Sequence, residues 1–155
     1  MLKQSAKRDV SQNRGYERSF TIKGKTLKNA GRVSGQVKKL LQEMGLPKEI
    51  VRRAAIVAYE AEINISLYAE HGRIILRVLP GEITIEARDK GQGIQNVELA
   101  VKEGYSTATE DFWRMGFGAG MGFSNMKRFS DVFSITSKVG KGTNLKMIIY
   151  HGENY

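Results

Sequence analysis

Hydrophobic residues recur along the chain with two different periods, and the alternation of these periods predicts the order of the secondary-structure elements. Residues 19–23 alternate between polar and apolar side chains, as in a strand with one buried face. Over residues 27–44, apolar side chains recur at steps of three and four, which predicts an amphipathic helix that ends at Gly45. Pro47 suits the first turn of a second helix, which we expect to run to about Glu70.

The second half of the chain is expected to form two hairpins separated by a glycine-rich region. Residues 73–79 and 83–88 flank Pro80 and Gly81, which favour a tight turn. Glycine is too dense over residues 89–122 for a packed element, because each interior glycine costs about 1 kcal/mol relative to alanine. We expect a loop there, interrupted by a short helix near residues 97–103. The remaining pattern predicts one more helix and two closing strands, over residues 121–129, 132–137 and 144–150.

This order of elements predicts an α+β fold, a two-layer α/β sandwich with helices packed on one face of a mixed, largely antiparallel sheet. A chain of 155 residues has room for a single domain. We divide it into a flexible, basic N-terminal arm (1–17), one domain (18–150) and a short C-terminal tail (151–155).

The composition narrows the possible functions. The chain contains no cysteine, which excludes disulfides, thiol catalysis and zinc–thiolate sites. No apolar run reaches the roughly 20 residues of a membrane-spanning helix, and the amino terminus lacks the apolar stretch of a secretory signal. We therefore expect a cytoplasmic protein with no membrane partner. The net charge of +9 suits a solvated surface, an acidic protein partner or nucleotide phosphates. No motif for reading nucleic acid accompanies that charge.

Glu60 and Asn64 lie four residues apart in the second predicted helix and therefore share one of its faces. Apolar residues occupy the same face, and polar groups on such a stripe are costly unless something satisfies them. One interpretation is that the helix turns this pair to solvent. The other is a site for a hard cation, in which the Asn64 amide oxygen binds Mg²⁺ and Glu60 accepts a proton or holds a water molecule.

Three glycine-containing motifs follow this helix. Residues 89–93 read D-x-G-x-G directly after a predicted strand; the glycines would let the backbone approach a ligand, although this pattern is also a common turn. Residues 116–122 read G-F-G-A-G-M-G and open onto a helix, whose free N–H groups can bind phosphate oxygens. They lack the Gly-Lys-Ser/Thr of a Walker loop and the βαβ context of a dinucleotide fold. Residues 140–143 read G-K-G-T, which also suits a simple hairpin turn.

In this order, E-x-x-x-N, D-x-G-x-G, G-x-G-x-G and G-x-G-T resemble the N, G1, G2 and G3 boxes of the GHKL ATPases. This superfamily includes gyrase, the Hsp90 chaperones and histidine kinases. Over about residues 18–150, the chain looks most like the bacterial anti-sigma-factor and switch-protein serine kinases, and residues 104–107 and 126–131 are similar to segments of the stress-response switch kinases. The resemblance implies the Bergerat-type ATP-binding fold, with ATP and Mg²⁺ as cofactors.

The resemblance also implies a role for each matching residue. Asn64 would coordinate Mg²⁺, and Glu60 would polarise the attacking hydroxyl or water. Asp89 would accept a hydrogen from the adenine amino group, which favours ATP over GTP. Gly91 and Gly93 would let the base approach, and Thr143 would assist Asp89 through water. The residues that would line the triphosphate are Gly118, Gly120, Met121 and Gly122. Ser106 and Thr107 would contact phosphate from a mobile lid.

By the same resemblance, we expect a serine/threonine protein kinase that acts on a small antagonist protein in a partner-switching pathway and also binds a sigma factor or another regulator. The alternative is a nucleotide-gated protein-binding module with little or no turnover. The resemblance further suggests a homodimer formed through residues 18–44. Two features depart from the family pattern: a long lid with acidic and aromatic residues, and Glu62, which is charged where relatives usually carry a small or apolar residue.

Overall fold

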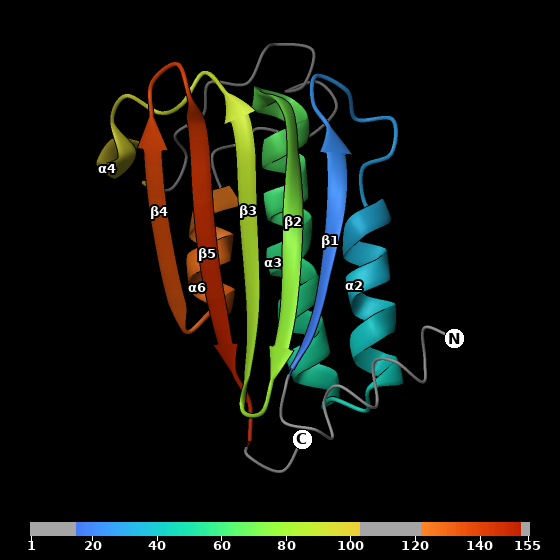
Figure 1. The fold of residues 1–155 in the computed structure, drawn as a ribbon. Coiled ribbons are helices and arrows are strands. Elements are labelled where there is room, and N and C mark those ends of the chain that lie inside the picture. The colour runs from blue at the N-terminus through green and yellow to red at the C-terminus, as the bar shows by residue number, and fades with distance from the viewer. Residues whose placement is uncertain (1–14, 103–121, 153–155) are drawn as a thin grey trace.

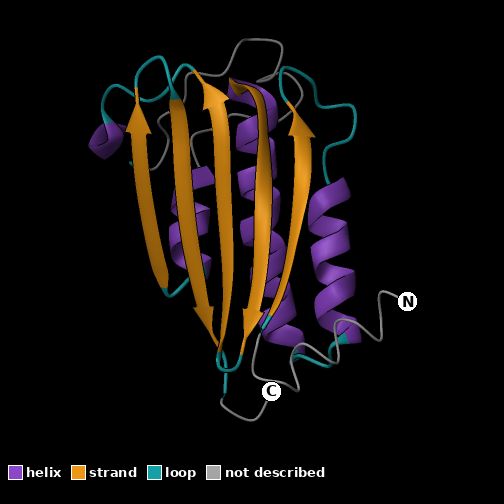
Figure 2. Cartoon of the chain, in the orientation of Figure 1, coloured by secondary structure: helices purple, strands orange, loops and turns teal. Residues whose placement is uncertain are grey.

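The computed structural model describes residues 15–102 and 122–152. Its five strands form one sheet in the order β1-β2-β3-β5-β4, and every pairing is antiparallel. Helices α2, α3 and α6 all lie on one face of this sheet (Figures 1 and 2). The two-layer α+β fold predicted from the sequence is therefore confirmed. The elements are, in chain order, β1 (Tyr16–Lys23), α2 (Arg32–Glu43), α3 (Lys48–Tyr68), β2 (Ala69–Leu79), β3 (Glu82–Gly91), α4 (Val97–Ala100), α6 (Gly122–Phe129), β4 (Val132–Lys138) and β5 (Gly142–Tyr150).

The core lies between the sheet and its helical layer. Alternate residues of each central strand point into this layer, so Ile83 and Ile85 of β3 lie beside Ile149 and Met147 of β5, and all four are buried. Helix α3 is the centre of the core, because ten of its 21 residues are buried. This alternation is the period-two pattern from which the strands were predicted.

The junction between α3 and β2 differs from the sequence prediction. The helix ends at Tyr68 and the strand begins at Ala69 with no loop between them, whereas the pattern predicted a helix to about residue 70 and a strand from 73. Ala69 pairs with Gly91 of β3, and the Glu70 carbonyl accepts a hydrogen bond from Gly24 N at 3.0 Å. Because Ala69 and Glu70 make these sheet hydrogen bonds and pairings, they belong to the strand and not to the helix. The β2–β3 register is irregular between Ala69 and His71, where the chain changes direction.

The ends of the chain are described only in part. Strand β1 begins at Tyr16, so the sheet includes two residues that we assigned to the amino-terminal arm. Residues 1–14 and 153–155, which make up the rest of the arm and the end of the tail, lie outside the described residues. None of the described helices combines the length and apolar composition needed to cross a bilayer.

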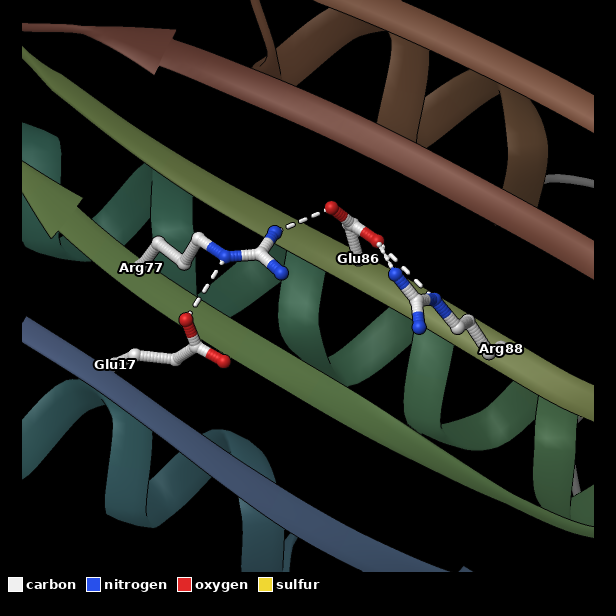
Figure 3. A network of polar contacts seen from close by, with 4 residues as sticks. All are labelled: Glu17, Arg77, Glu86 and Arg88. Carbon is white, nitrogen blue, oxygen red and sulfur yellow. Dashed lines mark hydrogen bonds and ion pairs between the residues drawn. The ribbon is translucent and has the colours of Figure 1, made fainter.

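The face of the sheet turned away from the helices is polar and carries a network of ion pairs (Figure 3). Arg77 of β2 donates to Glu17 of β1 at 3.2 Å and also pairs with Glu86 of β3. Glu86 accepts two further hydrogen bonds from Arg88, at 2.9 and 3.2 Å. A surface ion pair such as Arg77–Glu17 contributes little to stability by itself. The sheet therefore has one face turned to solvent and one face packed against the helices, as is common for antiparallel sheets.

Glu62 of α3 is a carboxylate inside the core, with only 2% of its surface exposed. Its two oxygens accept hydrogen bonds from Val33 N at 3.1 Å and Ser34 N at 3.2 Å, in the first turn of α2. Gly31, which precedes α2, has no side chain to cap the helix. Free N–H groups and the helix dipole both favour a negative charge at this position. Glu62 therefore caps α2 from the neighbouring helix, which gives this departure from the family pattern a structural role.

We expect Glu62→Ala to lower the free energy of unfolding by about 2–4 kcal/mol, because it leaves the Val33 and Ser34 amides buried without their acceptor. Glu62→Gln keeps one carbonyl oxygen as an acceptor and should cost less. Urea denaturation measures both. Glu70→Ala removes an exposed carboxylate near the end of the same helix and should change stability by no more than about 0.5 kcal/mol. Equal stabilities for Glu62→Ala and Glu70→Ala would contradict the capping role.

Candidate functional site

A cavity of about 490 Å³ lies where the end of α3 meets the ends of β3 and β5. Four of the residues predicted to bind nucleotide line it, namely Asn64, Asp89, Gly93 and Thr143. Its volume lies within the range of roughly 300–1,000 Å³ that is typical of small-molecule sites. The other lining residues are mixed apolar and polar: Tyr68, Gln92, Ile94, Gln95, Asn96, Leu99, Ala100, Phe123 and Val139.

Asp89 lies near the end of β3, and its carboxylate is tied to the next strand. Its Oδ1 accepts a hydrogen bond from Thr143 N of β5 at 3.1 Å. Burial raises the pKa of Asp89, and the hydrogen bond from Thr143 N opposes this rise. The structure therefore brings Asp89 and Thr143 together through a direct hydrogen bond from the Thr143 backbone. That Thr143 also assists Asp89 through water stays a prediction.

The glycines of the two motifs allow backbone segments to approach one another. A Cβ on Gly142 would lie 2.1 Å from the Asp89 carbonyl oxygen. Gly93 has a φ of +75°, and a Cβ there would lie 2.3 Å from the Lys138 carbonyl oxygen. A Cβ on Gly91 would lie 2.9 Å from the Tyr68 carbonyl oxygen. These contacts give the glycines a packing role. We also predicted that Gly91 and Gly93 let a nucleotide base approach, and this role stays a prediction.

Ser137 of β4 is a central hydrogen-bonding group of the site that the sequence analysis missed. Its Oγ accepts a hydrogen bond from Ile94 N at 2.8 Å. The same Oγ lies 3.1 Å from the Gly142 carbonyl oxygen and 2.8 Å from the Thr143 hydroxyl. Ser137 thus joins the loop after β3 to the start of β5. Only the strand register reveals this role, because Ser137 pairs with Thr143 across the β4–β5 hairpin.

Glu60 and Asn64 share a face of α3, but they have different surroundings. Asn64 lines the cavity, whereas Glu60 is not among its lining residues. Instead, Glu60 Oε1 accepts a hydrogen bond from Asn125 Nδ2 of α6 at 3.2 Å. A Cβ on Gly122, the first residue of α6, would lie 3.3 Å from Glu60 Oε2. Burial raises the pKa of Glu60, and the hydrogen bond from Asn125 opposes this rise.

Part of the predicted site falls outside the described residues. The proposed lid residues Ser106 and Thr107, and Gly118, Gly120 and Met121 of the predicted triphosphate loop, all lie within residues 103–121. Gly122 is described and begins α6. In the two described segments, no group of three or more His, Cys, Asp or Glu side chains could hold a metal ion. The predicted metal ligand Asn64 is among the residues that line the cavity.

Comparison with known proteins agrees with this geometry. Residues 46–151 match the family described as histidine kinase-, DNA gyrase B-, and HSP90-like ATPases. An anti-sigma F factor of Caldanaerobacter subterraneus subsp. tengcongensis is 38% identical over 108 residues, which cover 68% of this chain and 66% of the relative. The serine/threonine-protein kinase RsbT of Bacillus subtilis is 29% identical over 100 residues, 64% of each chain. The match therefore spans a little under two thirds of the length of these relatives.

A solved structure shows the same fold at low sequence identity. The SiaB-SiaC complex from Pseudomonas aeruginosa contains a chain that is 12% identical, with a TM-score of 0.58. The alignment covers 94% of this chain and 97% of the other. This similarity concerns the fold alone.

We expect Asn125→Ala to destabilise the protein more at high pH than at low pH. Burial raises the pKa of Glu60 above its ordinary value of 4.5. Its charged form therefore lowers stability above the folded-state pKa, and this cost disappears as the pH falls to the unfolded-state pKa. Asn125 offsets part of the cost, so its loss should reduce the free energy of unfolding by about 1–2 kcal/mol near pH 8 and by less near pH 4.

Urea denaturation at the two pH values measures this difference. Tyr59, the neighbouring titratable group, has a pKa raised from 10.0 and stays neutral throughout this range. Ser124→Ala, a substitution in the same turn of α6, serves as the control and should show no such pH dependence. An equal loss at both pH values in Asn125→Ala would mean that Asn125 does not stabilise the ionised Glu60.

Proposed function

This chain belongs to the family of histidine kinase-, DNA gyrase B- and HSP90-like ATPases, and from that premise we propose that it binds ATP with Mg²⁺ and phosphorylates serine or threonine in a protein partner. The observation that carries this proposal is the cavity that Asn64, Asp89 and Thr143 line together. The resemblance to a serine/threonine-protein kinase supports the transfer step.

The cavity residues fit an adenine base. Asp89 offers a carboxylate in a half-buried setting, beside apolar side chains of Ile94, Leu99 and Val139 that could cover the faces of a ring. A carboxylate accepts hydrogen bonds and donates none when ionised. It therefore suits the amino group of adenine and opposes the carbonyl group that guanine carries at the same position.

Asn64, which lines the cavity, fits a metal-bound phosphate chain. Asn64 would supply an amide oxygen, the kind of ligand that Mg²⁺ accepts together with phosphate oxygens and water. When bound, Mg²⁺ would neutralise charge on the phosphates. Helix α6 begins at Gly122, which follows the glycine-rich residues 116–121 in the sequence, so its first N–H groups would favour a nearby phosphate.

Glu60 would accept the proton of the substrate hydroxyl. Its raised pKa moves it towards the working pH, where a general base transfers protons most effectively. Its contacts with Asn125 and Gly122 lie at the start of α6, which follows the glycine-rich residues 116–121 in the sequence. Phosphoryl transfer requires positioning and charge neutralisation more than covalent chemistry, and these residues would supply both.

The partner is proposed to be a small antagonist protein in a partner-switching pathway, with a sigma factor or similar regulator as a second partner. The anti-sigma F factor relatives support this class, and the net charge of +9 would favour an acidic partner surface. A homodimer through residues 18–44 remains part of the proposal, as does a cytoplasmic location. Strand β1 in that segment is an edge of the described sheet, which leaves one side open for pairing.

Two substitutions should separate chemistry from binding. Glu60→Gln keeps the size of the side chain but loses the charge, so phosphoryl transfer should fall at least about a hundredfold while ATP affinity stays within about 1 kcal/mol. Asp89→Asn should first weaken ATP binding, by roughly 1.5–3 kcal/mol, because it loses a charge-assisted hydrogen bond. Transfer is measured with radiolabelled ATP and Mg²⁺ and the protein products of neighbouring genes.

The outcomes distinguish the two candidate functions. Transfer to a serine that Glu60→Gln abolishes would establish the kinase. ATP binding without transfer to any candidate would favour the nucleotide-gated binding module, and undiminished transfer in Glu60→Gln would reject the catalytic role of Glu60.

The metal site has a separate test in thermal stability. ATP should raise the melting temperature modestly without Mg²⁺ and clearly with it, because a ligand that binds the native state stabilises it. Asn64→Ala should abolish the Mg²⁺-dependent part of the rise. Gln95→Ala, which changes another amide that lines the cavity, should retain that part. GTP stabilisation equal to that by ATP would contradict the role of Asp89 in recognising adenine.

A further inference from the structure

The hydroxyl groups of Ser137 and Thr143 form a short hydrogen-bonded chain beside Asp89. Ser137 Oγ has three neighbours: Ile94 N at 2.8 Å, the Gly142 carbonyl oxygen at 3.1 Å and Thr143 Oγ1 at 2.8 Å. Thr143 lines the cavity next to Asp89 and is only 5% exposed. The direction of the protons in this chain decides what Thr143 can offer a ligand.

Two of the three neighbours of Ser137 fix that direction. A hydroxyl group has one proton to donate and two lone pairs to accept with. The Ile94 amide can only donate, so it takes one lone pair of Ser137, and the Gly142 carbonyl can only accept, so it takes the proton. The remaining contact, with Thr143, must therefore use the Thr143 proton. The reverse direction would place a lone pair of Ser137 against the Gly142 carbonyl oxygen and leave that contact without a hydrogen.

We propose that Ser137 determines the purine specificity of the site, by holding the Thr143 proton so that Thr143 and Asp89 present only hydrogen-bond acceptors to the cavity. Adenine carries an amino group at position 6, which donates. Hypoxanthine and guanine carry a carbonyl oxygen there, which needs a donor. A site whose buried polar groups would stay unpaired against an analogue rejects that analogue strongly.

This inference rests on the proposed nucleotide site and names the residue that tunes it. Ser137 acts through Thr143, so it is a positioning residue. It also holds the loop after β3 through Ile94 N, and a purely structural role there would affect every nucleotide equally. The ratio of two affinities separates the two roles.

The test compares binding of ADP and IDP by isothermal titration calorimetry, which needs no turnover. The two nucleotides differ in the 6-amino and 6-oxo groups of the base, with the accompanying ring proton. In Ser137→Ala, the Thr143 hydroxyl loses its acceptor and becomes able to donate to a 6-oxo group. We expect the preference for ADP over IDP to fall about three- to tenfold relative to wild type, the worth of one hydrogen bond.

Two further variants keep the comparison interpretable. Ser134→Ala makes the same change on the same strand, but Ser134 is exposed and pairs with Lys146 on the open face of the sheet, so the wild-type ratio should persist. Thr143→Val keeps the shape of the side chain and removes the acceptor, so it should lower the ADP preference even if Ser137→Ala folds poorly.

The outcomes are distinct. A loss of ADP and IDP affinity by the same factor in Ser137→Ala would overturn the inference and leave Ser137 as a structural residue. Wild-type protein that binds both nucleotides equally would also overturn it, together with the role of Asp89 in selecting adenine, while nucleotide binding at the cavity would stand. Wild-type protein that binds neither would overturn the proposed function and this inference together.

Discussion

The packing of α3 against the sheet is the constraint on which the rest of the structure depends. The helix contacts α2, α6 and four of the five strands, and small residues such as Ala54, Ala58 and Ala61 let it approach them closely. A helix surrounded in this way leaves few polar groups of its second half to solvent, so its carboxylates find partners in neighbouring elements: Glu62 in α2 and Glu60 in α6. The functional site is built from those neighbours.

A second constraint is the close approach of backbones at the end of the sheet where the cavity opens. The sequence left residues 89–93 and 140–143 open as simple turns, and the family resemblance implied a ligand-binding role for them. The glycines within them are sites where one backbone touches another. Gly142 lies against Asp89 and Gly93 against Lys138. Any larger residue would push the β4–β5 hairpin away from β3. Because this contact also brings Thr143 N to the Asp89 carboxylate, the same glycines that permit the packing align the acceptors of the cavity.

The sequence predicted those features of the structure that depend on the residue pattern of one helix or strand alone. Hydrophobic periodicity depends only on which face is buried, so the order of helices and strands could be predicted. Four of the predicted nucleotide-binding residues line one cavity, and their roles there stay predictions. Ser137 and Asn125 could not be found in this way, because their roles depend on strand register and on the docking of α6 against α3. The end of α3 was misplaced for a similar reason: the pairing of Ala69 with Gly91 is a long-range contact that local propensity does not report.

The two glutamates of α3 show how position in the fold separates structure from chemistry. Both carboxylates are removed from bulk water to some degree, but Glu62 meets two backbone N–H groups at the start of α2. Its charge is therefore matched by the peptide dipoles of that helix. Glu60, two residues earlier, receives one side-chain hydrogen bond, from Asn125, among the described residues, and burial raises its pKa. The charge of Glu60 is thus only partly satisfied by the described residues, which suits a group that accepts a proton. Within a single turn of α3, one glutamate thus caps a neighbouring helix and the other is the candidate general base.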